Sequence, residues 1–176
     1  LSSQRKSNRY FEGKKVTLLP EGVYEVGKVI FDELKQMEVD AIGGLATGAY
    51  PIVTAVALIS YQEGKPIPSF IVGEEPKEHG TRRKIEGHLE EGFRVVIVDD
   101  VITTGGSVNK AIEAVEALNC KVVKVIVLVD RHDGGSDELR KRGYDFTAIL
   151  GYPASREVTI DESSAVTGEV RERVLP

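Results

Sequence analysis

The chain has 176 residues, of which 41% are hydrophobic and 29% are charged, enough for one well-buried domain and short for two. Its formal net charge of -5 gives no electrostatic footprint for nucleic acid or an anionic membrane. No apolar run approaches the roughly 20 residues of a membrane span, no signal-peptide pattern opens the chain, and the single cysteine, Cys120, excludes an internal disulfide and fits a reducing, cytoplasmic compartment.

The first part of the chain predicts an arm, a strand and a helix. Residues 1–13 are polar and basic, which is typical of a solvated arm. We expect a short strand over residues 15–19. From Pro20 to Met37 the apolar residues keep helical spacing, with proline at a permitted first-turn position.

A glycine-rich loop then connects a brief strand, residues 41–43, to an apolar helix over about residues 51–61. The loop residues GLATG, of which Gly44, Ala46, Thr47 and Gly48 are candidate ligands, let backbone N–H groups approach an anion just before a helix begins. Taken alone the signal is weak, because an ordinary strand-to-helix connection explains it as well.

After a predicted strand at residues 69–72, the segment 73–87 is highly charged and almost devoid of apolar residues. It carries five basic side chains: Lys77, His79, Arg82, Arg83 and Lys84. A connection of this length in a compact domain is usually disordered or functional. It predicts either a mobile charged hairpin or a lid that closes over a polyanion.

The central stretch, RVVIVDDVITTGGSV (residues 94–108), carries the most chemistry. An apolar, β-branched run predicts a buried parallel strand that delivers Asp99 and Asp100 to its end. A turn follows, and we expect Ser107 to cap the next helix. The residues of this turn lie at the positive end of that helix and suit a phosphate. They are Thr103, Thr104, Gly105, Gly106 and Ser107. The two carboxylates can accept from sugar hydroxyls or hold magnesium, so together the features indicate a sugar phosphate.

Further predicted elements are a buried strand at residues 121–129, a helix at 136–142, a strand at 145–150 and a last helix at 169–174. Arg131 follows the first of these strands, at the edge where ligands bind in open parallel sheets. A surface ion pair with Asp133 would explain the presence of Arg131 equally well. The order of elements predicts an α/β domain with a mainly parallel sheet flanked by helices.

The central stretch resembles the phosphoribosyl pyrophosphate (PRPP) signature of the type I phosphoribosyltransferases: apolar strand, Asp-Asp, two variable positions, then Thr-Thr-Gly-Gly-Ser. Three further segments narrow the resemblance to the orotate phosphoribosyltransferases. They are KEHGTRRKIEG, similar to that family's lid, Val-Asp-Arg ending at Arg131, and GGLATGAYPI, similar to its pyrophosphate loop. The resemblance covers the chain up to about Leu150 and begins inside the family pattern, so we expect the family's N-terminal helix to be missing from a single phosphoribosyltransferase domain over residues 1–176.

The resemblance implies an enzyme that joins orotate to PRPP in pyrimidine nucleotide biosynthesis, giving orotidine 5′-phosphate and pyrophosphate. It implies catalytic roles for Asp99, Asp100, Lys77 and His79, and contacts to orotate from Thr103 and Arg131. It also implies Mg²⁺ bound mainly through PRPP, and a homodimer in the cytoplasm whose lids reach the partner's site.

The sequence departs from the family pattern in the lid. Gly73 and Glu74 stand where the family carries an Arg-Lys pair, so that two cations facing pyrophosphate are replaced by no charge and a negative charge. Two alternatives therefore stay open: a PRPP-binding regulatory relative with weak or no transferase activity, and a transferase for another nucleobase.

Overall fold

The computed structural model describes residues 13–76 and 83–150. Its helices are α1 (Lys14–Thr17), α2 (Pro20–Leu34), α3 (Ala49–Gln62), α4 (Gly106–Glu116) and α5 (Gly135–Lys141). Its strands are β1 (Ala41–Leu45), β2 (Ser69–Pro76), β3 (Arg83–Gly87), β4 (Arg94–Ile102), β5 (Lys121–Asp130) and β6 (Phe146–Leu150). The predicted N-terminal arm and the predicted helix at residues 169–174 lie outside the described residues.

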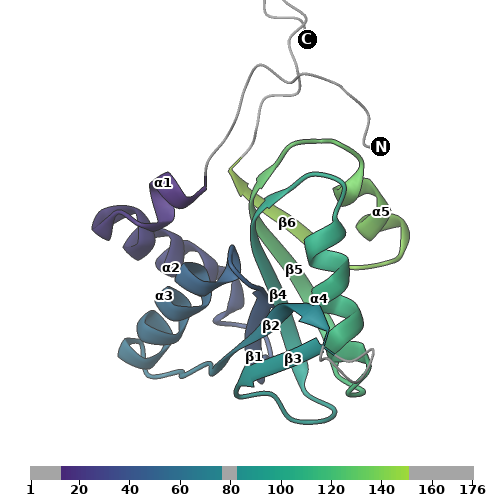
Figure 1. Cartoon of the computed structure of the whole chain (residues 1–176). Helices are drawn as coiled ribbons and strands as arrows, with labels where there is room; N and C mark the ends of the chain where they lie inside the picture. The colour runs from purple at the N-terminus through teal and green to yellow at the C-terminus, as the bar shows by residue number, and fades with distance from the viewer. Residues whose placement is uncertain (1–12, 77–82, 151–176) are drawn as a thin grey trace, which may run out of the picture.

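The described strands form one six-stranded sheet in the order β3-β2-β1-β4-β5-β6. All neighbours pair in parallel except β2 and β3, which are antiparallel. Helices α2 and α3 cover one face of the sheet, and α4 and α5 cover the other (Figure 1). The predicted α/β fold with a mainly parallel, helix-flanked sheet is confirmed.

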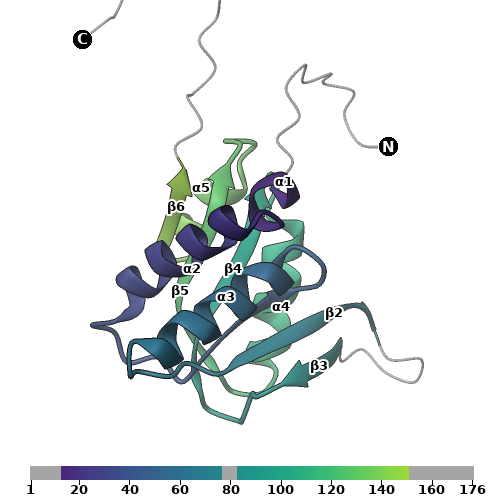
Figure 2. The ribbon, with the colours of Figure 1, turned by 90° about the vertical axis from the view of Figure 1, so that its left-hand side faces the viewer.

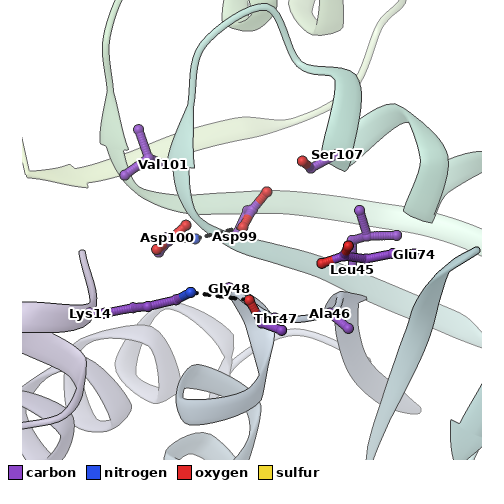
Figure 3. Close-up of a pocket in the computed structure, with 10 residues that line it drawn as sticks. All are labelled: Lys14, Leu45, Ala46, Thr47, Gly48, Glu74, Asp99, Asp100, Val101 and Ser107. Carbon is purple, nitrogen blue, oxygen red and sulfur yellow. Dashed lines mark hydrogen bonds between the residues drawn. The ribbon is translucent and has the colours of Figure 1, made fainter. Parts of the chain in front are cut away.

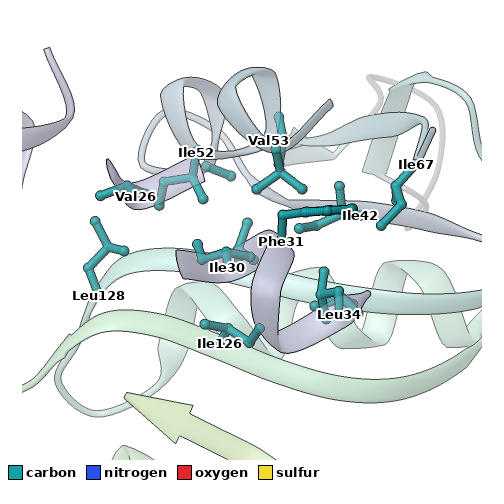
Figure 4. Close-up of a cluster of buried hydrophobic side chains, with 14 of the residues drawn as sticks. Val26, Ile30, Phe31, Leu34, Ile42, Ile52, Val53, Ile67, Ile126 and Leu128 are labelled. Atoms are coloured by element: carbon teal, nitrogen blue, oxygen red, sulfur yellow. The ribbon is translucent and has the colours of Figure 1, made fainter. Parts of the chain in front are cut away.

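Strand β4 shows why the sheet is buried on both faces. Val96 and Val98 belong to the apolar cluster beneath α2 and α3, which Figure 4 shows in part, whereas Val95 and Ile97 belong to the cluster beneath α4. All four side chains are almost fully buried. Successive side chains of a strand point to opposite faces, so a strand between two helical layers needs apolar residues at every position.

The prediction of a strand at residues 15–19 is wrong, because α1 occupies most of this segment. The N–H groups of Val16 and Thr17 both donate to the carbonyl oxygen of Gly13 at 3.0 Å, which closes a helical turn. The turn packs against α2, where a Cβ at Gly22 would lie 2.2 Å from the carbonyl oxygen of Val16. A short β-branched run has no periodicity of its own, and here docking on a neighbouring helix decided its structure.

The predicted capping role of Ser107 is also wrong. Helix α4 begins at Gly106, and its N-cap is Gly105, two residues before Ser107, in the left-handed conformation with φ of 83°. No side chain of the described residues caps this helix end. Glycine adopts that conformation without the strain of a Cβ, so the turn itself rather than a hydroxyl sets where the helix starts.

The charged segment at residues 73–87 contributes to two strands. Its first part extends β2, and its last part is β3, which pairs antiparallel with β2 in the manner of a hairpin. Figure 2 shows this pair at the edge of the sheet, away from β6. The predicted hairpin is thus present in its two arms, while residues 77–82 lie outside the described part of the chain.

The positions of β1 and β4 locate the candidate site. These two strands are neighbours in the middle of the sheet, yet the chain leaves β1 through α3 towards β2 and leaves β4 through α4 towards β5. The two connections therefore diverge. In open α/β sheets, such a divergence opens a crevice at the carboxyl ends of the strands, where ligands bind.

Candidate functional site

A pocket of about 200 Å³ lies at the carboxyl ends of β1 and β4. It is lined by residues from four separate segments of the chain: Lys14, Leu45, Ala46, Thr47, Gly48, Glu74, Asp99, Asp100, Val101 and Ser107 (Figure 3). The structure therefore brings the predicted acid pair, part of the predicted glycine-rich loop and Ser107 to one place.

The acid pair at the end of β4 is asymmetric. Asp99 is only 6% exposed, whereas Asp100 is partly exposed. The backbone N–H of Asp100 donates to Oδ1 of Asp99 at 2.9 Å. Burial, followed by the negative charge of Asp100, raises the pKa of Asp99 to about 7. A carboxyl group in this range can be protonated or ionised near neutral pH, as groups in functional sites often can.

The glycine-rich loop after β1 approaches these acids closely. A Cβ at Gly48 would lie 2.4 Å from Oδ1 of Asp99 and 2.9 Å from Oδ1 of Asp100. Only glycine permits that distance, so the backbone of the loop is held directly against the carboxylates. The Ala46–Thr47 peptide bond is cis. Gly44 lies at the buried end of β1, beneath the pocket rather than in its lining.

The turn between β4 and α4 stands beside the pocket. Of its predicted ligands, Ser107 lines the pocket, while Thr103, Thr104, Gly105 and Gly106 continue from the end of β4 into the helix. The first N–H groups of an α-helix have no partner within the helix, and they lie at the positive end of its dipole. Because α4 begins at this turn, its N-terminus can receive an anion.

Arg131 lies outside the pocket lining, directly after β5. Its backbone N–H donates to the carbonyl oxygen of Ile102 at 3.1 Å, which fixes the residue beside the end of β4. Its side chain is 25% exposed, and Nη2 lies 3.5 Å from Oδ2 of Asp133. The predicted ion pair with Asp133 is confirmed, and it holds the guanidinium at the carboxyl edge of the sheet.

Two predicted catalytic residues, Lys77 and His79, lie outside the described residues. The pocket contains one cation that the sequence did not indicate: Lys14, at the start of α1, whose Nζ donates to Oγ1 of Thr47 at 3.2 Å. Glu74, at one of the altered lid positions, also lines the pocket. The pair Lys14-Lys15 resembles any solvated surface pair in sequence, so no local signal could have revealed it.

The fold and the pocket agree with the result of the family comparison. The chain belongs to the phosphoribosyltransferase family, since the model of the phosphoribosyl transferase domain matches residues 14–150. The match spans α1 to β6, and thus every element that contributes to the pocket.

Individual relatives narrow the class further. The chain is 43% identical to the orotate phosphoribosyltransferase of Aquifex aeolicus, over 85% of this chain and 82% of the relative. It is also 43% identical to the orotate phosphoribosyltransferase of Nostoc sp., over 85% of this chain and 73% of the relative. The orotate phosphoribosyltransferase of Mycobacterium tuberculosis in complex with Fe(III) dicitrate superposes with a TM-score of 0.73 at 33% identity, covering 86% and 85% of the two chains.

A crystal structure of the same Mycobacterium enzyme in complex with PRPP has a TM-score of 0.71 at 30% identity, covering 81% of this chain and 80% of the other. The protein is thus a member of the orotate phosphoribosyltransferase family, and the resemblance noted in its sequence is confirmed. None of the helices in the described part of the chain is long and apolar enough to cross a membrane.

Proposed function

We propose that this protein transfers the phosphoribosyl group of PRPP to orotate, giving orotidine 5′-phosphate and pyrophosphate in pyrimidine nucleotide biosynthesis. The observation that carries the proposal is the meeting of the acid pair, Asp99 and Asp100, with the loop of Thr47 and Gly48 in one pocket. PRPP has a phosphate at one end, a diphosphate at the other and ribose hydroxyls between, and the pocket offers one group for each.

The turn from Thr103 to Ser107, at the N-terminus of α4, would bind the 5′-phosphate through backbone N–H groups and hydroxyls. Asp99 and Asp100 would accept hydrogen bonds from the ribose hydroxyls. As the bond from ribose carbon 1 to the diphosphate oxygen breaks, positive charge develops on the sugar ring, and a nearby carboxylate stabilises that charge. No covalent intermediate on the protein is required, because the orotate nitrogen forms its bond to the same carbon and gives up its proton to the departing diphosphate.

The diphosphate would lie against the loop of Ala46, Thr47 and Gly48, with Gly44 supporting this loop from the buried end of β1. Lys77 and His79, on the segment between β2 and β3, are proposed from the sequence to bind it from the other side and to exclude water. Arg131 would bind the carboxylate of orotate with paired donors, and Thr103 would contact the base.

Magnesium is proposed as the cofactor, bound mainly through PRPP. Among the described residues, no three His, Cys, Asp or Glu side chains are grouped so that they could hold a metal ion by themselves. The acid pair offers hard oxygen ligands of the kind Mg²⁺ accepts alongside phosphate oxygens and water. The ion would offset the charge of the diphosphate as it leaves. We further propose that the protein acts in the cytoplasm and that it is a homodimer. Light scattering on the purified protein tests the oligomeric state.

The direct test mixes the protein with PRPP, Mg²⁺ and orotate, follows the absorbance of orotate, and measures PRPP binding in parallel by calorimetry. Turnover of orotate is the expected result. Binding of PRPP without turnover would instead favour the regulatory alternative, for which Glu74 in the pocket lining is the one structural argument. Turnover with a different base alone would favour the second alternative. Failure of the folded protein to bind PRPP would refute the whole assignment.

A further inference from the structure

Lys14 is a pocket residue that neither the sequence motif nor the proposed roles account for. It is the first residue of α1, and its ammonium group donates to the hydroxyl of Thr47 at 3.2 Å (Figure 3). Within the described lining of the pocket it is the one positively charged side chain, opposite the carboxyl groups of Glu74, Asp99 and Asp100.

The backbone that carries Lys14 is fixed in place. A Cβ at Gly13, the residue before it, would lie 2.8 Å from Oδ2 of Asp100, so the start of α1 is pressed against the acid pair. Thr17, at the other end of the short helix, is only 2% exposed. The ammonium group therefore reaches the pocket from an anchored segment.

The partner of Lys14 identifies which part of the ligand it faces. The loop from Gly44 to Gly48, sequence GLATG, contains no cationic side chain, although the proposed function gives it a diphosphate to bind. An ammonium group has three donors. One donates to Thr47, and two remain for oxygen atoms of an anion held against the same loop.

We propose that Lys14 binds the diphosphate of PRPP and supplies the positive charge that the Gly44–Gly48 loop lacks. The assignment rests on the proposed function and adds a residue to it. When the bond between ribose carbon 1 and the diphosphate oxygen breaks, its electron pair stays on that oxygen. The ammonium group of Lys14 stabilises this negative charge. The orotate nitrogen completes the new bond to carbon 1 and gives up its proton, which the departing diphosphate takes up.

The test uses three probes that divide PRPP into its parts: inorganic pyrophosphate with Mg²⁺, ribose 5-phosphate, and PRPP itself. Each is titrated calorimetrically into the wild type, Lys14→Gln and Lys14→Arg. We expect Lys14→Gln to bind pyrophosphate and PRPP roughly ten- to a hundredfold more weakly, the usual range for a lost hydrogen bond to a charged group. Binding of ribose 5-phosphate should be unchanged, and Lys14→Arg should retain most of the pyrophosphate affinity.

Lys141→Gln is the matched control, since Lys141 is exposed on α5 and lies outside the pocket lining; it should bind all three probes as the wild type does. Unaltered pyrophosphate binding by Lys14→Gln would overturn the assignment while leaving the proposed function intact. An equal loss for ribose 5-phosphate would overturn it too, because it would mean that Lys14 only supports the fold of the pocket. A wild type that does not bind PRPP would instead refute the proposed function itself, and the role of Lys14 with it.

Discussion

The backbone N–H of Gly135 donates to the carbonyl oxygen of Thr103 at 3.0 Å. This bond joins the loop after β5, which carries Arg131, to the loop after β4, which carries the proposed phosphate ligands. A Cβ at Gly135 would lie 2.5 Å from the backbone nitrogen of Gly105 and 2.6 Å from the oxygen of Thr103. The two loops are therefore packed backbone to backbone, and the proposed orotate and phosphate contacts are positioned by one rigid unit.

Gly135→Ala is expected to raise the KM for PRPP several-fold and to lower the free energy of unfolding by about 1–3 kcal/mol, the usual cost of overpacking. The added methyl group must push the phosphate loop away. Steady-state kinetics and urea unfolding measure the two effects. Gly64→Ala is the control, because Gly64 has φ of 74° but no atom within 4 Å of a Cβ. It should lose roughly 1 kcal/mol through backbone strain with KM unchanged; an equal KM change in both variants would contradict the packing argument.

Asp99 should make the protein less stable as the pH rises. Burial and the charge of Asp100 raise its pKa to about 7, from 3.8. Between these values the unfolded chain has released the proton while the folded protein still holds it, so the free energy of unfolding falls with increasing pH. The stabilisation is complete below pH 3.8 and is lost as the pH passes 7. Asp99→Asn should remove this decline and unfold at higher urea concentration than the wild type at pH 8.

Asp40 provides the control of opposite sign. Hydrogen bonds from the side chain and backbone of Arg94 hold the pKa of Asp40 at about 2. Its contribution is present above pH 3.8 and is lost as the pH falls through 2. Asp40→Asn should therefore lower stability by the same amount throughout the window from pH 4 to 7. Identical pH dependence in the wild type and Asp99→Asn would show that the pKa of Asp99 is not raised.

Arg131→Lys should raise the KM for orotate by roughly ten- to a hundredfold, because lysine cannot provide paired donors to a carboxylate. The dissociation constant for PRPP should stay the same. Asp133→Asn, which removes only the ion pair at 3.5 Å, should leave the KM for orotate unchanged or lower it. A loss of PRPP affinity in Arg131→Lys would place the arginine at the phosphate rather than at the base.

The altered lid positions are expected to limit the rate. Glu74 adds a negative charge to the lining of the pocket where pyrophosphate is proposed to leave. Gly73→Arg combined with Glu74→Lys should therefore raise kcat with orotate. Glu63→Lys makes a charge change of the same size as Glu74→Lys on an exposed residue after α3, and should have no effect. An unchanged kcat in the double variant would mean that these positions do not control the reaction.

The order and composition of residues along the chain were enough to predict the parallel sheet and the local chemistry of its central strand. Six residues of β4 are apolar, and β5 contains a longer unbroken run of the same kind. Such runs are stable only between two helical layers. The residues Asp99 to Ser107 are consecutive, so a pattern along the chain was sufficient to predict an acid pair followed by an anion-binding turn. Periodicity also located α2, α3 and α4 within a few residues.

Packing in three dimensions determines which segments share the pocket and what charge they bring to it. The helical state of Lys14–Thr17 follows from packing against α2, and the place of Lys14 beside Thr47 follows from the approach of Gly13 to Asp100. The contacts of Lys14 with Thr47 and of Gly13 with Asp100 join residues more than thirty positions apart in the chain. Local sequence patterns report backbone preference and burial, whereas the charge of a pocket depends on distances in space that are fixed once the helices pack on the sheet.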